Sequence, residues 1–186
     1  MKDIKTTTLT ATLRGIRPIM FDRYAGDNKT KLPVMEKFYT APSGHLVIPV
    51  LNLYSLLAAQ NTPSVAKRFY GKQARDVALG VMSFVSIEAT GDDPLNAQIL
   101  DADGKAYTIK DPRIEVLQHV ARVKDGVPNP KERPMLPTGW QIKIQLTHQE
   151  NTLLTAACLQ TMLDQGGILG LGTFRPIFGR YTVEWK

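Results

Sequence analysis

Polar and apolar residues alternate along several stretches of the chain, with the period of two that is typical of half-buried β-strands. Residues 6–20 alternate threonine with leucine and alanine until Gly15 and Pro18 interrupt the pattern. Residues 140–148 alternate as regularly, with large apolar side chains at every second position. Shorter strands are predicted over residues 34–40, 45–49, 84–89, 116–124 and 177–185.

Helical patterns lie between these strands. Asn52 is a residue type that caps helices, and we expect the helix that it begins to continue to Ala59. A second helix is predicted over residues 72–83 and a third over residues 152–165. The glycine pair 166–167 is expected to end the third helix.

Three further segments have the composition of turns and loops. Residues 22–33 are polar and predict a loop. Residues 91–104 carry turn residues at both ends and predict a small hairpin. Residues 125–134 contain three prolines and one glycine. Because proline lacks the N–H that regular structure needs, this segment predicts an ordered, projecting loop.

The order of the elements is strand, helices, strand, loop, strand, helix, strand, which predicts a single α+β domain over residues 1–186. We expect an antiparallel sheet with the helices on one face. A ferredoxin-like (RRM-like) arrangement fits this order, with the hairpins and loops as insertions.

Composition agrees with a folded domain. Hydrophobic residues make up 43% of the 186 residues, which excludes a disordered chain. No apolar run approaches the roughly 18 residues that span a bilayer. The first five residues lack an apolar signal segment, so we expect a cytoplasmic protein. The one cysteine, Cys158, lies in an apolar helical pattern and is predicted to be a buried structural thiol.

The charge balance favours a polyanionic partner. Lys and Arg total 23 against 17 acidic residues, a formal net charge of +6, and cations that neutralise phosphates release condensed counterions. Four basic residues lie within nine residues that contain no acid, with Phe69 and Tyr70 between them; they are Lys67, Arg68, Lys72 and Arg75. This mixture suits contacts with phosphates and bases, although a solvated helix face is the alternative.

Residues 166–181 are rich in glycine, carry two arginines and contain no acid. Consecutive backbone N–H groups in such segments form concavities that bind anions, which predicts a phosphate site around Gly170, Gly172 and Gly179. The alternative is that these glycines only let the last helix and the last strand cross closely. The segment is neither a dinucleotide fingerprint nor a P-loop, because its Gly-x-Gly follows a helix and it has no lysine.

Side chains of the same segment extend this prediction. Arg175 and Arg180 are candidates for bidentate phosphate contacts. Phe174, Phe178 and Tyr181 are candidates to stack on unstacked bases. For Phe174 and Phe178, a place in the hydrophobic core is the alternative.

The helix, the Gly-x-Gly loop and Phe178-Gly179-Arg180-Tyr181 before the last strand resemble the C-terminal signature of the RAMP superfamily. These are RNA-binding proteins of CRISPR systems with ferredoxin-like folds. A second match begins with Ile48-Pro49 and a short helix, which resembles the backbone-subunit branch of that family. That branch continues with Gly-Ser-Ser-Leu-Lys-Gly. This chain departs there: Val50 and Leu51 replace Gly and Ser, Tyr54 stands at the lysine position, and Ser55 stands at the second glycine.

The resemblance implies that the protein binds along a single-stranded or guide RNA, as a repeated subunit of a ribonucleoprotein filament or homo-oligomer. The sequence also resembles proteins of bacteriophages and mobile elements. Near the predicted loop 125–134, such backbone subunits carry a hairpin that wedges into the bound strand. The candidate nucleic-acid contacts in and beside this loop are Arg122, Lys124, Lys131 and Arg133, and the candidate wedge residues are Val127, Met135 and Leu136. A surface loop stiffened by proline is the alternative.

The sequence carries little that indicates catalysis. The three histidines, His45, His119 and His148, have no cysteine or carboxylate at metal-ligand spacing, so no metal and no cofactor are predicted. Asp22 and Asp27 are weak candidates for a metal-dependent endonuclease, because loop carboxylates can hold Mg²⁺ beside a phosphate. A phage assembly or structural protein is a further alternative.

Overall fold

The computed structural model describes residues 5–27, 29–122 and 128–186. Its central element is a four-stranded antiparallel sheet with the order β10-β1-β9-β5. The strands are β1 (Thr6–Gly15), β5 (Val85–Ala89), β9 (Gln141–Gln149) and β10 (Tyr181–Trp185). With helices after the first and third of these strands, this is the order of a ferredoxin-like fold, so the predicted fold class is confirmed.

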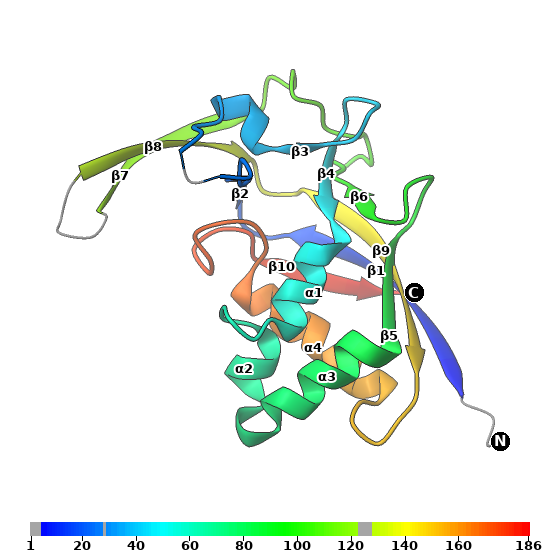
Figure 1. The fold of residues 1–186 in the computed structure, drawn as a ribbon. Helices are drawn as coiled ribbons and strands as arrows, with labels where there is room; N and C mark the ends of the chain where they lie inside the picture. The colour runs from blue at the N-terminus through cyan, green and yellow to red at the C-terminus, as the bar shows by residue number, and fades with distance from the viewer. Residues whose placement is uncertain (1–4, 28, 123–127) are drawn as a thin grey trace.

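Helices cover one face of this sheet (Figure 1). They are α1 (Val50–Ala58), α2 (Val65–Phe69), α3 (Ala74–Phe84) and α4 (Ala156–Leu169). Between sheet and helices, Ile142, Ile144 and Leu146 are fully buried, as their alternation predicts. Each such burial contributes about 2 kcal/mol. No helix among the described residues is long and apolar enough to cross a membrane.

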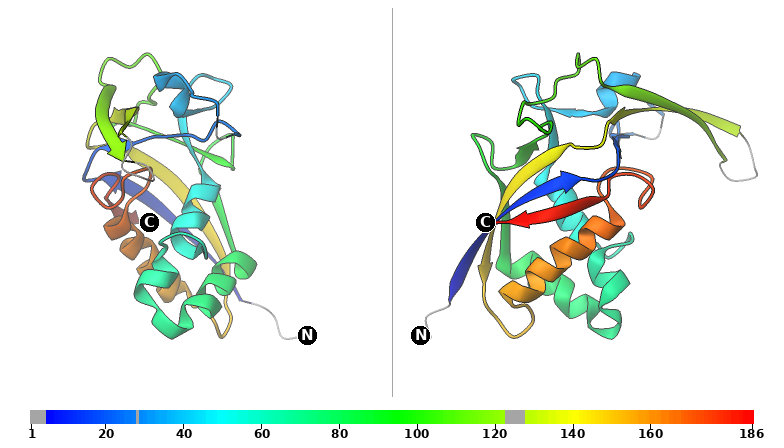
Figure 2. Two further views of the ribbon diagram at one scale, coloured as in Figure 1. Left: turned by 60° about the vertical axis from the view of Figure 1, so that its left-hand side comes forward. Right: turned by 180° about the vertical axis from the view of Figure 1, so that it is seen from behind.

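Two small sheets are inserted into this core. One has the order β3-β4-β6 and the other the order β2-β8-β7. Their strands are β2 (Ile19–Met20), β3 (Tyr39–Thr40), β4 (Leu46–Pro49), β6 (Asn96–Gln98), β7 (Glu115–Arg122) and β8 (Pro128–Leu136). Strands β7 and β8 form a hairpin that projects from one side of the molecule (Figures 1 and 2).

The prediction of a loop over residues 125–134 is wrong for its described part, because β8 begins at Pro128. The prolines of β8 occupy alternate positions, and their main-chain groups face away from β7. The carbonyl of Pro134 accepts from Phe21 N at 3.0 Å, and the carbonyl of Glu132 accepts from Lys37 Nζ. The even-numbered residues of β8 therefore make no main-chain hydrogen bonds to β7. A proline at these positions removes no hydrogen bond between the two strands, although it lacks an N–H.

The glycine pair 166–167 lies inside α4 and does not end it. A Cβ on Gly166 would come within 2.4 Å of the Tyr181 hydroxyl, so glycine is needed there for β10 to pack against the helix. The helix ends at Leu169, followed by Gly170 at φ 84°. It begins at Ala156, where the Thr155 side chain accepts from Cys158 N, and Cys158 itself is only half-buried.

Other boundaries also differ from the prediction. Helix α1 starts at Val50, directly after Pro49, so Asn52 is not its cap. Residues Val34–Lys37 form a 3-10 helix (η1) in place of the expected strand. Residues 91–104 were expected to form a hairpin of their own. Strand β6, which lies in this segment, pairs instead with β4, and Ala97 lies opposite Ile48. Sequence patterns also missed α2, which Ser64 caps, and the 3-10 helix η2 (Gly71–Gln73).

Candidate nucleic-acid interface

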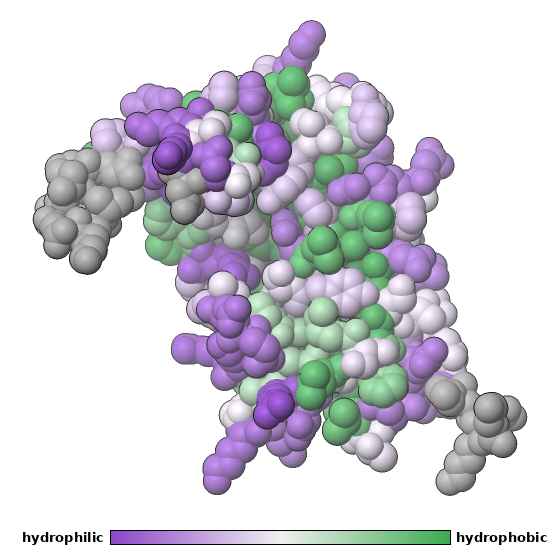
Figure 3. All heavy atoms as spheres, in the orientation of Figure 1, coloured by the Kyte–Doolittle hydropathy of each residue, from purple (hydrophilic) through white to green (hydrophobic). Residues whose placement is uncertain are grey.

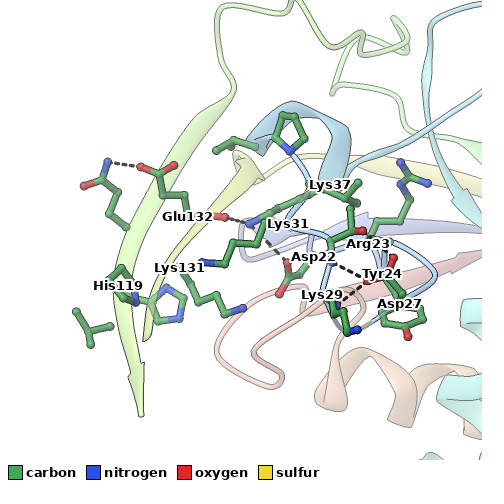
Figure 4. Close-up of a pocket in the computed structure, with 18 residues that line it drawn as sticks. Asp22, Arg23, Tyr24, Asp27, Lys29, Lys31, Lys37, His119, Lys131 and Glu132 are labelled. Carbon is green, nitrogen blue, oxygen red and sulfur yellow. Dashed lines mark hydrogen bonds and ion pairs between the residues drawn. The ribbon is translucent and has the colours of Figure 1, made fainter. Parts of the chain in front are cut away.

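A cavity of about 880 Å³ opens between the β7–β8 hairpin and the segment 22–37, and we call it the hairpin groove (Figure 4). His119, Lys131 and Glu132 come to it from the hairpin. Basic residues dominate its charged lining; they are Arg23, Lys29, Lys31, Lys37 and Lys131.

The acidic residues of the groove are already engaged by neighbours. Asp27 accepts hydrogen bonds from the Thr30 hydroxyl and from the backbone N–H groups of Lys29 and Thr30, each at 2.6 Å. These bonds, with the Thr30 hydroxyl first, lower the pKa of Asp27. Glu132 accepts from the Gln118 amide at 2.8 Å. The Asp27 bonds close the turn that presents Lys29 to the groove.

Asp22 is the centre of a partly buried ion-pair cluster. Arg133 Nε and Nη2 donate to one oxygen of Asp22 at 2.8 and 2.6 Å. Lys37 Nζ lies 3.8 Å from the other oxygen and also donates to the Glu132 carbonyl. Arg133 Nη1 lies 2.7 Å from His119 Nε2. This cluster ties the base of the hairpin to the segment that begins the groove.

The charge that remains unpaired in the groove is positive. Among the residues that the structure describes, neither Arg23 nor the lysines at 29, 31 and 131 form an ion pair with a carboxylate. Arg23 donates through Nε to the Glu36 carbonyl at 2.9 Å, which fixes the side chain and leaves its charge unneutralised. Such a concave, cation-lined surface attracts phosphates.

The two weak catalytic candidates, Asp22 and Asp27, are not joined by further metal-ligating side chains among the described residues. Asp22 and Asp27 both line the groove, but each carboxylate is occupied by the contacts given above. Within the described part of the chain, no group of three or more His, Cys, Asp or Glu side chains is placed to hold a metal ion. The endonuclease hypothesis therefore gains no support from the geometry.

The glycine-rich loop, residues 170–180, supports the close-crossing alternative. A Cβ on Gly179 would lie 1.8 Å from the Leu171 carbonyl oxygen, and one on Gly172 would lie 2.4 Å from that of Met20. The N–H groups of Gly170 and Gly179 already donate to Gly166 and Pro18 carbonyls, both at 2.7 Å. The predicted phosphate concavity is therefore wrong for these two N–H groups, since other parts of the chain have taken them.

The arginines of this loop are partly buried. Burial lowers the pKa of Arg175. Arg180 accepts through its carbonyl from Ile16 N at 2.8 Å, and its Nε is buried without a described partner. Their predicted phosphate contacts stay predictions.

The basic cluster around α2 lies on the same side of the molecule as the hairpin and the glycine-rich loop (Figures 1 and 2). All four of its predicted members are exposed; they are Lys67, Arg68, Lys72 and Arg75. Figure 3 shows hydrophilic residues gathered along this edge below the hairpin. The face thus formed runs from the groove past the glycine-rich loop to α2.

The hairpin candidates have different fates. Lys131 lines the groove, whereas Arg133 is only 8% exposed and is paired with Asp22. Met135 and Leu136 are buried, so their prediction as wedge residues is wrong. They pack against β2, where Leu136 pairs with Ile19. The side chain of Arg122, together with Lys124 and Val127, lies outside what the structure describes.

The three histidines lie in different surroundings. His45 Nδ1 lies 3.1 Å from Ser43 Oγ and 3.2 Å from Gln98 Nε2. His148 is fully buried, and neither of its ring nitrogens has a described hydrogen-bond partner. His119 contacts Arg133 in the ion-pair cluster around Asp22.

Sequence reasoning missed the basic residues that precede the hairpin in the chain, namely Arg23, Lys29, Lys31 and Lys37. The first three lie in the predicted polar loop over residues 22–33, and Lys37 lies in the predicted strand over residues 34–40. The spacing of the lysines was a weak signal that could have marked this part of the chain as a binding surface.

No family model matches the sequence, and no curated protein matches it. Solved structures match its fold. A chain in the cryo-EM structure of the Type III-B Cmr-beta bound to cognate target RNA has a TM-score of 0.60 and 11% sequence identity, over 98% of this chain and 59% of that chain. The crystal structure of Cmr6 from Pyrococcus furiosus has a TM-score of 0.43 and 10% identity, over 98% of this chain and 99% of that chain.

At 11% identity, the first match shows a shared fold alone. It agrees with the ferredoxin-like fold class that the order of elements predicted. This chain spans about three fifths of the length of that neighbour.

Proposed function

We propose that the protein binds single-stranded RNA by its phosphate backbone, with the strand lying in the hairpin groove and continuing past the glycine-rich loop toward α2. The observation that carries this proposal is the set of unneutralised cations in the groove, Arg23, Lys29, Lys31 and Lys131. Cations in a concave surface concentrate phosphates and release counterions when the phosphates bind.

The fold supports RNA as the ligand. The neighbour with the TM-score of 0.60 is part of an assembly bound to cognate target RNA. We do not expect the RNA to lie on the open face of the four-stranded sheet, which is the surface that RRM domains use. This face carries polar residues such as Thr8, Arg14 and Lys143 in place of the aromatic side chains on which RRM domains stack bases.

Photochemical cross-linking tests where the RNA lies. A single-stranded RNA with photoreactive uridines is bound to the protein and irradiated, and the cross-linked peptides are identified by mass spectrometry. We expect cross-links in residues 23–34, 118–136 and 170–180. Cross-links confined to the open sheet face, or no capture of RNA beyond that of a matched neutral polymer, would contradict the proposal.

Repeated binding along the strand is the second part of the proposal and follows from the sequence resemblance. Analytical ultracentrifugation with RNAs of increasing length measures it. The number of bound protein molecules should rise in proportion to RNA length, with a fixed number of nucleotides for each. A constant stoichiometry of one on every RNA would show that the protein binds as a single subunit.

A further inference from the structure

One aromatic side chain is exposed where the glycine-rich loop meets the hairpin. Phe174 is 40% exposed, whereas Tyr181 is only 3% exposed. The backbone of Phe174 has a φ of 56°, in the left-handed region that phenylalanine rarely adopts. Residues held in such conformations persist only where the surrounding structure fixes them, and they cluster at binding sites.

Two side chains of the hairpin fix the Phe174 ring. The guanidinium carbon of Arg133 lies 4.8 Å from the ring centroid. The His119 ring also lies 4.8 Å away, centroid to centroid, at an interplanar angle of 84°. Arg133 is itself held by Asp22, so the ring is positioned by a chain of contacts that begins in a partly buried ion pair. A ring already held in place loses little conformational freedom when a ligand stacks on it.

The location of Phe174 connects it with the hairpin groove. His119, which contacts its ring, is part of the groove lining. The residue that follows Phe174 in the chain, Arg175, is half-buried. A strand whose phosphates lie on the groove lysines would therefore bring a base to the open part of this ring.

We propose that Phe174 is a stacking site for one unstacked nucleobase of the bound strand, an inference that rests on the proposed function. Stacking on an aromatic ring tolerates every base, because each base has a π-face. The site would thus add affinity without selecting a sequence. Its contribution would differ from that of the lysines, since stacking does not change how binding depends on salt.

The test uses two variants of Phe174 and one matched control. Phe174→Leu keeps an apolar side chain but removes the ring, and Phe174→Trp keeps a ring for stacking. Leu95→Ala shortens a side chain that is 65% exposed and is not part of the groove lining. Binding is measured with single-stranded RNAs that carry 2-aminopurine at successive positions, because stacking quenches the fluorescence of this base.

For the wild type, Phe174→Trp and Leu95→Ala, we expect quenching at a defined position of the bound RNA. Phe174→Leu should lose that quenching and bind about fivefold more weakly or worse, with an unchanged salt dependence. Wild-type affinity and quenching in Phe174→Leu would overturn the stacking site while leaving RNA binding in place. A Phe174→Trp variant that unfolds at the same temperature as the wild type but shows no quenching would also overturn the stacking site. Failure of the wild type to bind any RNA would instead overturn the proposed function.

Discussion

The guanidinium of Arg133 reaches one carboxylate oxygen of Asp22 through two nitrogens, Nε at 2.8 Å and Nη2 at 2.6 Å. The two residues are 111 positions apart in the chain. Their pair joins the hairpin to the segment that lines the opposite side of the groove, and it also supports the ring of Phe174. The shape of the candidate interface therefore depends on an ion pair between two segments that are far apart in the chain.

Asp22→Asn should lower the free energy of unfolding by about 2 kcal/mol, because Arg133 would keep its buried charge without a counter-charge. Urea unfolding at neutral pH measures the change. Glu184→Gln is the matched control, since Glu184 pairs with Arg14 at the same 2.6 Å but with both side chains about half exposed. The control should cost less than about 1 kcal/mol. Equal costs for the two variants would show that the Asp22 pair has no special weight.

The glycine-rich loop predicts an unusually sensitive position. Gly179→Ala should destabilise the protein by at least about 3 kcal/mol, because its φ is 73° and the new Cβ would lie 1.8 Å from the Leu171 carbonyl oxygen. Gly44→Ala has a similar φ of 82° but no atom within 4 Å of the new Cβ, and it should cost only about 1 kcal/mol. Urea unfolding of both variants separates close crossing from backbone conformation. A small effect of Gly179→Ala would refute the crossing.

The Asp27 turn predicts a pH dependence. Hydrogen bonds, led by that from the Thr30 hydroxyl, lower the pKa of Asp27, so their stabilisation is present above the ordinary pKa of an aspartate and is lost as the pH falls through the lowered value. Thr30→Val removes the hydroxyl and should raise the pKa of Asp27 toward its ordinary value. NMR titration of the Asp27 carboxyl measures this shift. An unchanged pKa would mean that the hydroxyl bond is absent in solution.

Local patterns predicted the central sheet well, because each strand places its apolar side chains on one face. Strand β9 is the clearest case: its alternation alone identified Ile142, Ile144 and Leu146 as core residues. The same reasoning failed for β8, because the number of prolines in a segment does not show whether their main-chain groups face the neighbouring strand or point away from it. It failed for Gly166 because only the contact with Tyr181 shows why glycine is needed inside a helix.

The site was harder to predict than the fold. The basic cluster around α2 and the net charge were visible in the sequence, and so was the importance of the glycine-rich segment. The groove itself depends on non-local packing, which brings Lys31 and Lys131 to one cavity although they are a hundred positions apart in the chain. No local pattern could have shown that Arg133 is used internally while Lys131, two residues earlier, is free to face a ligand.

The salt dependence of RNA binding tests the central claim most directly. The triple variant Lys29→Ala, Lys31→Ala, Lys131→Ala is compared with Lys105→Ala, Lys110→Ala, Lys143→Ala, which removes the same charge outside the groove lining. Fluorescence anisotropy with a labelled single-stranded RNA gives the slope of log K against log salt concentration. If the groove holds the phosphates, its triple variant should lose about 2 units of slope, because each phosphate contact on a single strand contributes about 0.7. The control should keep the wild-type slope. A groove variant with the wild-type slope and affinity would contradict the account.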